Sequence, residues 1–540
     1  MKRFLTITAL LMALCAQAQQ PGRPARQAQA MPAEQIKADT SREPIYPGKY
    51  DGTVETLDDY VCPEWFRDAK FGIWAHWGPQ CEPEDNDWYA RNMYIEGERQ
   101  YNNNLNVKPH PSEFGFKDWI NEFHAERWDP EDLMTLYEYA GAKYFVSLAN
   151  HHDNFDLWDS QYQPWNSVNM GPYKDIVKGW AEAARRHGMK FGVSSHAGRA
   201  YSWYEVTRGS DSKGPLAGVP YDGFLTKEDG YGKWWDGYDP QDLYEQRQPL
   251  KSLPGQAYFD KFYNRTVDLI NRYNPDLLYF DDRFLPLWPA SDCGPKIAAH
   301  YYNKSIAENG GVNQVVITGK NLTEEQKHAV LLDVEKGAPD TIQELPWQTC
   351  TCIGNWHYDK HIYYEDTYKS SETVIGMLVD NVSKNGNLLL SVEIKGDGTI
   401  DATERRIVTE IGDWMKINGE SIYGTRPWYV FGEGPSTARN DSGNAASFNE
   451  GKRTYSAEDI RFNKKGDNVL YVTVLGIPEG DISVKSLGTK AGLADKKIKS
   501  VTMLGSTEKL SWKQNDDALD INRPDMSCIT CIPVFKVEFR

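Results

Sequence analysis

The feature that most constrains this chain is a repeated alternation of strand patterns and helix patterns between about residues 55 and 425. Apolar runs of strand length recur at 70–77, 144–150, 190–196, 277–282, 314–318, 331–335 and 387–392. Between them, apolar residues at helical spacing predict helices that include 130–139, 173–186, 255–272 and 403–417. Buried strands separated by helices are typical of a parallel sheet that helices cover. We therefore predict an α/β fold, with a (β/α)8-like parallel barrel over residues 46–427.

The pattern changes after Pro427. Short β-type runs are separated by Gly, Asn and Asp, and helical periodicity is nearly absent. These runs lie at 468–475, 482–484, 498–503 and 534–539. The pattern predicts a C-terminal β-sandwich domain over residues 428–540.

The first 18 residues have the pattern of a signal peptide. Lys2 and Arg3 precede the apolar stretch 4–14, and small residues before and at Ala18 suit cleavage there. The apolar stretch is too short to span a membrane. We expect cleavage near Ala18 and a periplasmic or secreted protein, with no membrane span in the rest of the chain.

Two further expectations concern the start of the chain. Cys15 would allow a lipoprotein anchor, but Met12 and Leu14 before it fit a lipidation motif poorly, so cleavage after Ala18 is the preferred reading. Residues 19–45 are rich in Gln, Ala and Pro and predict a disordered lead.

Composition narrows the choice of partners. The formal net charge is −17, and a strongly acidic protein is a poor partner for nucleic acid. Aromatic residues make up 13% of the chain, with 18 Trp and 31 Tyr, and flat rings suit the apolar faces of sugars. The composition therefore favours a neutral polar ligand over a polyanion, and it leaves the oligomeric state open.

The cysteines do not form a redox or zinc pattern. Seven would remain after cleavage at Ala18, and an odd number leaves at least one without an intramolecular partner. Cys528 and Cys531 have CxxC spacing, but they lie in a terminal segment without a βαβ context and no second CxxC accompanies them. We read this pair as structural.

Polar residues follow four of the predicted strands. His76, the run His151-His152-Asp153, the pair Asp281-Asp282, and Glu335 all come at or near a strand's carboxyl end. These ends meet at one rim of a parallel barrel, where ligand chemistry collects. A retaining glycosidase needs two carboxyl groups about 5–5.5 Å apart, and residues at two different strand ends can supply them.

The same histidines allow a different function, a metal-dependent barrel hydrolase. His76, His151, His152 and Asp153 would then be the ligands. Adjacent residues of a strand point to opposite faces, so His151 and His152 reach one ion only if the strand ends there. We expect no cofactor and no metal, and keep this hydrolase as an alternative.

The motifs and their order resemble the α-L-fucosidases of glycoside hydrolase family 29. The resemblance covers most of residues 60–428. It is carried by WFRDAKFG (65–72), HWG (76–78), AGAKY (140–144), HHD (151–153), LWDS (157–160), YNPD (273–276), PWQTC (346–350), NVSKNGNLLL (381–390) and NGESIY (418–423). Each motif alone is modest support, and their shared order is highly specific.

The resemblance implies roles for individual residues. Asp281 corresponds to the nucleophile, with Asp282 as its rival. His76, His151 and His152 correspond to the histidines that hold the hydroxyl groups of fucose. Trp77 or Trp88 would offer apolar surface to the sugar, and Tyr279 and Lys320 would also bind substrate. The acid/base position varies within the family, and Glu335 is the best candidate, with Glu344 and Asp333 as alternatives.

Four departures from the family pattern bear on which sugar is bound. Asp87 precedes Trp88 where the family often has Glu, Tyr279 stands where it has Trp, and Lys320 stands where it often has Arg. The segment ending at His196 replaces a common Tyr. These changes leave open a related sugar such as L-galactose.

The resemblance as a whole implies a function. The chain would be an exo-acting retaining hydrolase that releases terminal α-L-fucose from an oligosaccharide or glycoconjugate by double displacement. A catalytically inactive fucose-binding protein is the second alternative, because the changes at Asp87 and Lys320 could accompany a loss of activity.

Overall fold

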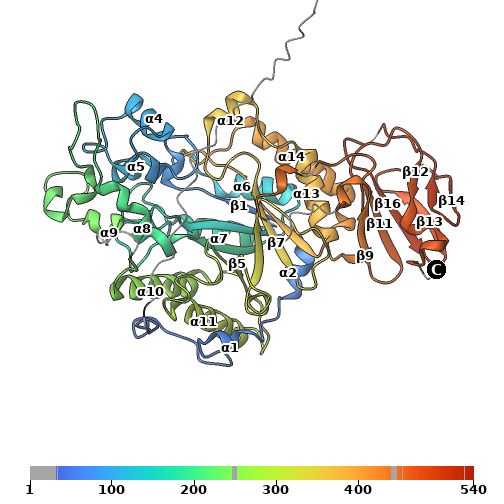
Figure 1. Cartoon of the computed structure of the whole chain (residues 1–540), viewed down its shortest axis with the longest axis horizontal. Coiled ribbons are helices and arrows are strands. Elements are labelled where there is room, and N and C mark those ends of the chain that lie inside the picture. The colour runs from blue at the N-terminus through green and yellow to red at the C-terminus, as the bar shows by residue number, and fades with distance from the viewer. Residues whose placement is uncertain are drawn as a thin grey trace, which may run out of the picture.

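Eight parallel strands form a closed barrel in the computed structural model, which describes residues 32, 34–245, 252–438, 447–452, 454–494, 496–527 and 529–540 (Figure 1). Each strand pairs with the next, and the last pairs with the first. The strands are β1 (Phe71–Ala75), β2 (Tyr144–Asn150), β3 (Lys190–Ser195), β4 (Leu277–Phe280), β5 (Val316–Lys320), β6 (Leu331–Glu335), β7 (Trp347–Cys352) and β8 (Gly386–Ser391). The predicted barrel is confirmed.

Helices cover the barrel and fill the connections between strands. Those that return the chain between strands or follow the last strand are α6 (Pro130–Tyr139), α7 (Ile176–Arg186), α10 (Gln256–Tyr273), α11 (Cys293–Glu308), α13 (Ser371–Ser383) and α14 (Ala402–Asn418). Shorter helices are α1 (Val54–Leu57), α2 (Glu64–Ala69), α3 (Tyr89–Asn92), α4 (Arg99–Val107), α5 (Phe116–Glu122), α8 (Ala200–Trp203), α9 (Pro240–Tyr244) and α12 (Lys360–Glu365). The long insertions that follow β1 and β3 carry α3–α5, α8 and α9, which lie together beyond one end of the barrel (Figure 1).

Local signals in the sequence set the ends of these helices. Helix α6 starts with Pro130 after Asp129, whose side chain accepts hydrogen bonds from two backbone N–H groups of the first turn. Asp401 caps α14 in the same way. Helix α10 stops at Asn274, which takes the left-handed conformation at φ 45°.

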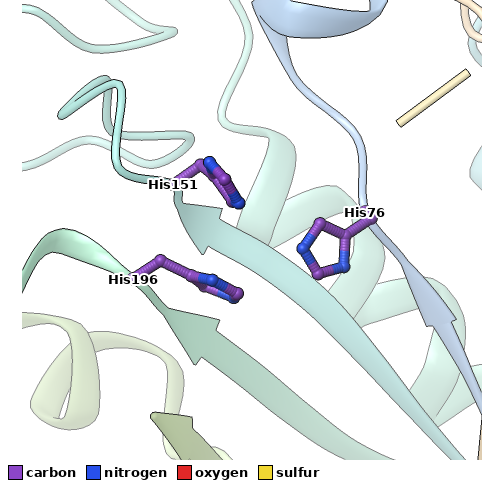
Figure 2. A group of neighbouring side chains, drawn as sticks. All are labelled: His76, His151 and His196. Carbon is purple, nitrogen blue, oxygen red and sulfur yellow. The ribbon is translucent and has the colours of Figure 1, made fainter. Parts of the chain in front are cut away.

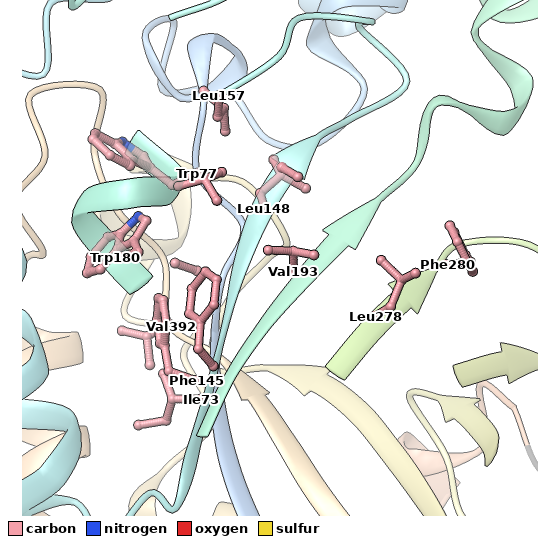
Figure 3. Packing of buried hydrophobic residues seen from close by; sticks show 14 of the residues in the cluster. Ile73, Trp77, Phe145, Leu148, Leu157, Trp180, Val193, Leu278, Phe280 and Val392 are labelled. Carbon is pink, nitrogen blue, oxygen red and sulfur yellow. The ribbon is translucent and has the colours of Figure 1, made fainter. Parts of the chain in front are cut away.

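Side chains alternate along each strand between the barrel interior and the helices. The interior is filled by Trp74, Tyr144, Val146, Leu277, Tyr279, Val316, Leu331, Cys350 and Leu389. The outward set includes Ile73, Phe145, Val193 and Leu278, which pack in the large core shared with the helices (Figure 3). The polar side chain of Gln348 also lies in the interior. Its amide is satisfied there, because it donates a hydrogen bond to Asp333 and accepts one from the Tyr144 hydroxyl.

Two antiparallel sheets follow the barrel. The larger has the order β13-β16-β11-β10-β9 and the smaller β12-β15-β14. Their strands are β9 (Arg426–Glu433), β10 (Ile460–Lys465), β11 (Val469–Val474), β12 (Ile482–Val484), β13 (Ile498–Met503), β14 (Trp512–Gln514), β15 (Leu519–Ile521) and β16 (Val534–Phe539). The sheets share one apolar core, and α13 lies between the barrel and strands β9 and β10 (Figure 1). This β domain agrees with the predicted class.

The signal-peptide residues 1–18 lie outside the described residues. Part of the predicted disordered lead is bound to the barrel domain. Ile36 forms a β-bridge with Ser291, and the Ala38 N–H donates a hydrogen bond to Asp292 at 2.9 Å. No helix within the described ranges is long and apolar enough to cross a membrane. Cys528 is outside the described residues, and the six described cysteines form no disulfide with one another.

Candidate active site

The carboxyl ends of six consecutive strands bring seven polar side chains to one rim of the barrel. His76 follows β1, His151 and His152 follow β2, His196 follows β3, and Asp281 follows β4, while Lys320 ends β5 and Glu335 ends β6. The imidazole rings of His76, His151 and His196 point into one shared space from three strand ends (Figure 2). Their ring centroids are 4.7–5.5 Å apart.

Asp281 is surrounded by cationic and hydrogen-bonding groups. Its Oδ1 accepts a hydrogen bond from the Lys320 ammonium at 2.5 Å. Its Oδ2 lies 3.2 Å from His152 Nε2 and 3.6 Å from His196 Nδ1. Burial alone would raise the pKa of Asp281, but Lys320, His152 and His196 together hold this pKa well below its usual value. The carboxylate is therefore ionised and oriented.

Lys320 joins the two candidate catalytic carboxyl groups. The same ammonium that contacts Asp281 donates to Glu335 Oε2 at 2.7 Å. The two carboxylate oxygens that share this ammonium can therefore be no more than about 5.2 Å apart. Retaining glycosidases keep their carboxyl groups about 5–5.5 Å apart, and inverting enzymes keep them about 6.5–9.5 Å apart. The bridge is compatible with the retaining arrangement.

The other candidate carboxyl groups are placed differently. Asp333 is buried one layer below the rim, where it accepts hydrogen bonds from Gln348, Cys350 and Tyr279. Glu344 is exposed in the segment before β7 and borders a separate pocket of about 90 Å³ with Leu332 and Trp347. Asp282 faces Arg199 at 3.9 Å. No described hydrogen bond or ion pair joins the side-chain carboxyl group of any of the three to the Lys320 ammonium, so Glu335 is the glutamate that the structure pairs with Asp281.

The histidine rings are held in defined protonation states. Burial lowers the pKa of His76 and His151 well below the usual value, and lowers that of His196 to about 4. The Gln80 amide, whose Oε1 accepts from the Ala90 N–H, donates to His151 Nδ1 at 2.9 Å. The single proton of the neutral His151 ring must then be on Nε2, which faces the site as a donor.

His152 differs from the other rings because both of its nitrogens face oxygen atoms. Nδ1 lies 2.6 Å from the His196 carbonyl, and Nε2 lies 3.2 Å from Asp281 Oδ2. These two oxygen atoms fix the orientation of the His152 ring beside Asp281.

The same side chains include possible metal ligands. One nitrogen from each of His76, His151 and His196 lies within 4.8 Å of the others, and His152, His196 and Asp281 form a second such group. The chemistry of the first group opposes a metal, because the proton that Gln80 keeps on His151 Nε2 occupies the lone pair that would bind it. In the second group, the Asp281 carboxylate already has a cation, because its Oδ1 accepts a hydrogen bond from the Lys320 ammonium at 2.5 Å, and this ammonium would repel a metal ion.

Several residues that border the site were not predicted. The Arg199 guanidinium donates to the Asp281 carbonyl at 2.7 Å, and the Trp203 ring lies 5.6 Å from that of His152. Trp356 lies 5.2 Å from His76. His357 donates from Nδ1 to Asp87 at 2.7 Å. Among the described residues, both ring nitrogens of His196 are buried without a hydrogen-bond partner.

The predicted aromatic contacts need two corrections, at Trp77 and Tyr279. Trp77 is only 1% exposed and packs against Phe123 and Trp180 outside the barrel, because its position in the strand pattern points to the helices. Trp88 is 39% exposed and lies 6.2 Å from His152, so of these two tryptophans it is the one that borders the site. Tyr279 is fully buried below His196 and does not reach the rim space.

Some of the missed residues carried a usable signal. His196 ends a predicted strand, so the rule that selected His76 also selects it. Arg199 and Trp203 lie in the insertion after β3, and Trp356 and His357 lie in the loop after β7, a strand that the sequence pattern did not reveal. No spacing in the sequence links these loops to the rim.

Comparison with known proteins gives a consistent result. A family model described as Alpha-L-fucosidase matches residues 38–420. The human tissue alpha-L-fucosidase is 26% identical over 501 residues and 91% of each chain, and the rat protein is 26% identical over 87% of each chain. A Thermotoga maritima alpha-fucosidase solved with fucose has a TM-score of 0.67 and 26% identity, over 90% of this chain and all of that one.

Proposed function

Because the chain belongs to the α-L-fucosidase family, glycoside hydrolase family 29, we propose that Asp281 and Glu335 are its two catalytic carboxyl groups. The chain is a glycoside hydrolase that releases α-L-fucose from a glycan with retention of anomeric configuration. The observation that carries the residue assignment is the Lys320 ammonium, which contacts both carboxyl groups at the rim. Ion pairing of this kind orients the pair for double displacement.

In the first step Asp281 attacks the anomeric carbon while protonated Glu335 gives its proton to the glycosidic oxygen. The bond between the anomeric carbon and that oxygen breaks, the rest of the glycan leaves as an alcohol, and a β-fucosyl ester of Asp281 forms. Oδ2 is the oxygen that we assign to the attack. It lies 3.2 Å from His152 Nε2 and 3.6 Å from His196 Nδ1, whereas Oδ1 is held by Lys320 at 2.5 Å.

In the second step Glu335, now ionised, takes a proton from water, and the water oxygen attacks the anomeric carbon. The ester bond breaks, Asp281 leaves as a carboxylate and the proton remains on Glu335. Two inversions at the same carbon give α-L-fucose. The low pKa of Asp281 makes this side chain a good leaving group in this step.

The neutral histidines are suited to hold the hydroxyl groups of the sugar. His151 presents an N–H, and His76 Nδ1 and His196 Nε2 are buried without a hydrogen-bond partner among the described residues, so hydroxyl groups can satisfy them. Trp88 offers an apolar ring beside them. The substrate class that this pocket supports is a fucosylated oligosaccharide or glycoconjugate with the fucose at its end.

We also propose that the protein acts outside the cytoplasm, in the periplasm or after secretion. The support is the sequence alone: two basic residues, an apolar stretch of signal-peptide length and small residues up to Ala18. Mass spectrometry of the protein purified from its own cells would test this, since cleavage near Ala18 removes the start of the chain. An N-terminus at Met1 in the mature protein would contradict it.

The nucleophile is tested by Asp281→Gly. We expect hydrolysis of an aryl α-L-fucoside to fall by more than about a thousandfold, because no covalent intermediate can form. Azide should fill the space that the carboxylate leaves and restore turnover with β-L-fucosyl azide as the product, which NMR distinguishes from the α form. A parallel Asp282→Gly variant is the control. Rescue of that variant instead, or an α-azide from Asp281→Gly, would overturn the assignment.

A further inference from the structure

A buried carboxyl group outside the catalytic pair spans the base of one loop of the pocket. Glu393 follows β8, is fully buried, and accepts hydrogen bonds from the backbone N–H groups of Asn355 and Asp359. These two residues are four apart in the loop that connects β7 to α12. One side chain therefore holds both ends of a short loop segment.

That segment carries two side chains that face the histidines of the pocket. The Trp356 ring lies 5.2 Å from His76. His357 lies 4.8 Å from His151 between ring centroids and donates a hydrogen bond at 2.7 Å to Asp87. A displacement of the loop would move both rings relative to the sugar site.

We propose that Glu393 is a positioning residue for sugar binding, which acts by fixing the loop that carries Trp356 and His357. The inference rests on the proposed function, because it takes the space beside Asp281 as the sugar site. Glu393 makes no contact with Asp281, Lys320 or Glu335 in the described structure, so its effect reaches the sugar through the loop.

A second buried carboxyl group supports Glu393 from below. Glu404 of α14 is fully buried, and its Oε1 accepts the backbone N–H of Glu393 at 3.1 Å. Its Oε2 is buried and has no hydrogen-bond partner among the described residues. Burial raises the pKa of both groups, that of Glu393 to about 8, so the pair holds a proton at neutral pH.

The loop side offers an independent way to disturb the same contact. A Cβ built on Gly354 would lie 2.3 Å from Glu393 Oε1 and 3.0 Å from the Tyr368 ring. Gly354→Ala must therefore displace the carboxylate, whereas Glu393→Ala removes it. If Glu393 positions the loop, the two substitutions act on one contact and their effects will not add.

The experiment is a double-mutant cycle with Gly354→Ala, Glu393→Ala and the double variant, measured as kcat and KM on an aryl α-L-fucoside. We expect each single variant to raise KM about tenfold with kcat changed less than about threefold, because binding of the sugar weakens before the chemistry does. We expect KM of the double variant to match that of Glu393→Ala. The proposal would be overturned if the effects of the two single variants on KM multiply in the double variant. It would also be overturned if the variants lower the melting temperature but leave KM unchanged.

Two further variants distinguish the proposed role from misfolding and test the proton that the Glu393–Glu404 pair holds. Glu393→Gln keeps the size of the side chain but turns one acceptor into a donor, so it should also raise KM, although less. In the natural protein KM should rise between pH 7 and 9 as the buried pair loses its proton and like charges repel. Glu404→Gln removes the like charge that ionised Glu393 would face, so this rise should become smaller, although burial still raises the pKa of Glu393. A rise of the same size in Glu404→Gln would contradict the role of the pair.

Several other titratable groups surround the Glu393–Glu404 pair. They come from the strands, helices and loops packed against it: Cys81, Tyr137, Cys352, Tyr358, Asp359, Tyr368 and Asp401. The cysteines and tyrosines have pKa values raised above their ordinary range by burial, so they stay neutral between pH 7 and 9. The double-mutant cycle tests Glu393, and azide rescue of Asp281→Gly tests the proposed function. The two can fail separately, because azide rescue does not depend on Glu393.

Discussion

A single lysine sets the charge state of Asp281, the proposed nucleophile. Lys320 is largely buried at 13% side-chain exposure, so its attraction for Asp281 is only weakly screened by water. One ammonium reaches both carboxyl groups at the rim. A lysine supplies the positive charge here without the fixed fork of a guanidinium.

Lys320→Met should move the acidic limb of the pH profile. Asp281 must be ionised to attack, so activity is lost as the pH falls through its pKa. Lys320 holds that pKa low, and its removal raises it. We expect the acidic limb of kcat/KM to move up by at least about one pH unit and the maximal rate to fall. Lys320→Arg, which keeps the charge, is the control. An unmoved limb in Lys320→Met would contradict this account.

The acid/base assignment is tested by the stereochemistry of rescue. Glu335→Ala should still form the fucosyl ester from a substrate with a good leaving group, because that step then needs little protonation. Azide should attack the ester and give α-L-fucosyl azide, the opposite anomer from the Asp281→Gly product. Asp333→Asn and Glu344→Gln are matched controls. Rescue in either control and not in Glu335→Ala would move the assignment to that residue.

At the residue scale the sequence predicted those groups that end strands. His76, His151, His152, Asp281, Lys320 and Glu335 all meet at the rim because strand ends of a parallel barrel converge. Trp77 was misplaced, since the residue after His76 turns to the outer face of the barrel. His357 and Trp356 depend on how a loop folds back, which spacing in the sequence does not encode.

At the element scale the loop after β2 is held by one buried arginine. Arg265 of α10 binds both carboxylate oxygens of Asp156 at 2.8–2.9 Å and donates to Asn154 at 2.6 Å. The Asn150 side chain donates to the same carboxylate and accepts from the His196 N–H. This network fixes the turn that presents His151 and His152.

Arg265→Met should destabilise the turn after β2 that presents His151 and His152. It leaves the Asp156 carboxylate buried without its cation, and such a loss costs about 3–5 kcal/mol of the free energy of unfolding. We expect this loss in urea denaturation together with a lower kcat/KM. Arg186→Met on α7 is the control, since Arg186 pairs with Glu131 at 55% and 45% side-chain exposure and should cost less than about 1 kcal/mol. Equal losses in the two variants would contradict the role of the network.

Elements with strong local signals were predicted closely. Strands 144–150 and 331–335 and helix 130–139 match β2, β6 and α6. Strand β7 was missed because its run of Gln, Thr and Cys lacks an apolar pattern. Inside the barrel the Gln348 side chain is satisfied by Asp333 and Tyr144. The predicted list also lacks α11 and α13, where burial on nearly all sides blurs the helical period.

At the scale of the whole molecule, a buried ion network joins the barrel to the β domain. Asp380 of α13 lies 2.6 Å from Arg461 of β10 and 2.7 Å from Lys384, and all three side chains are at most 1% exposed. The Trp414 indole of α14 donates to the Ile532 carbonyl beside β16. The two parts therefore share polar contacts that water cannot replace.

Asp380→Asn should weaken this junction more than any surface contact does. The substitution leaves two buried cations facing a neutral amide, and the loss of one partner of a buried pair costs about 3–5 kcal/mol. We expect calorimetry to show a lower melting temperature and a transition that divides into two, because the barrel and the β domain have separate cores. Glu420→Gln is the matched control: Glu420 pairs with Lys536 between the same two parts, but at 41% and 26% side-chain exposure, so it should cost less than about 1 kcal/mol. If Asp380→Asn unfolds in one transition at the wild-type temperature, the network does not hold the two parts together, and their coupling must come from their other contacts, such as the packing of α13 and the Trp414 hydrogen bond.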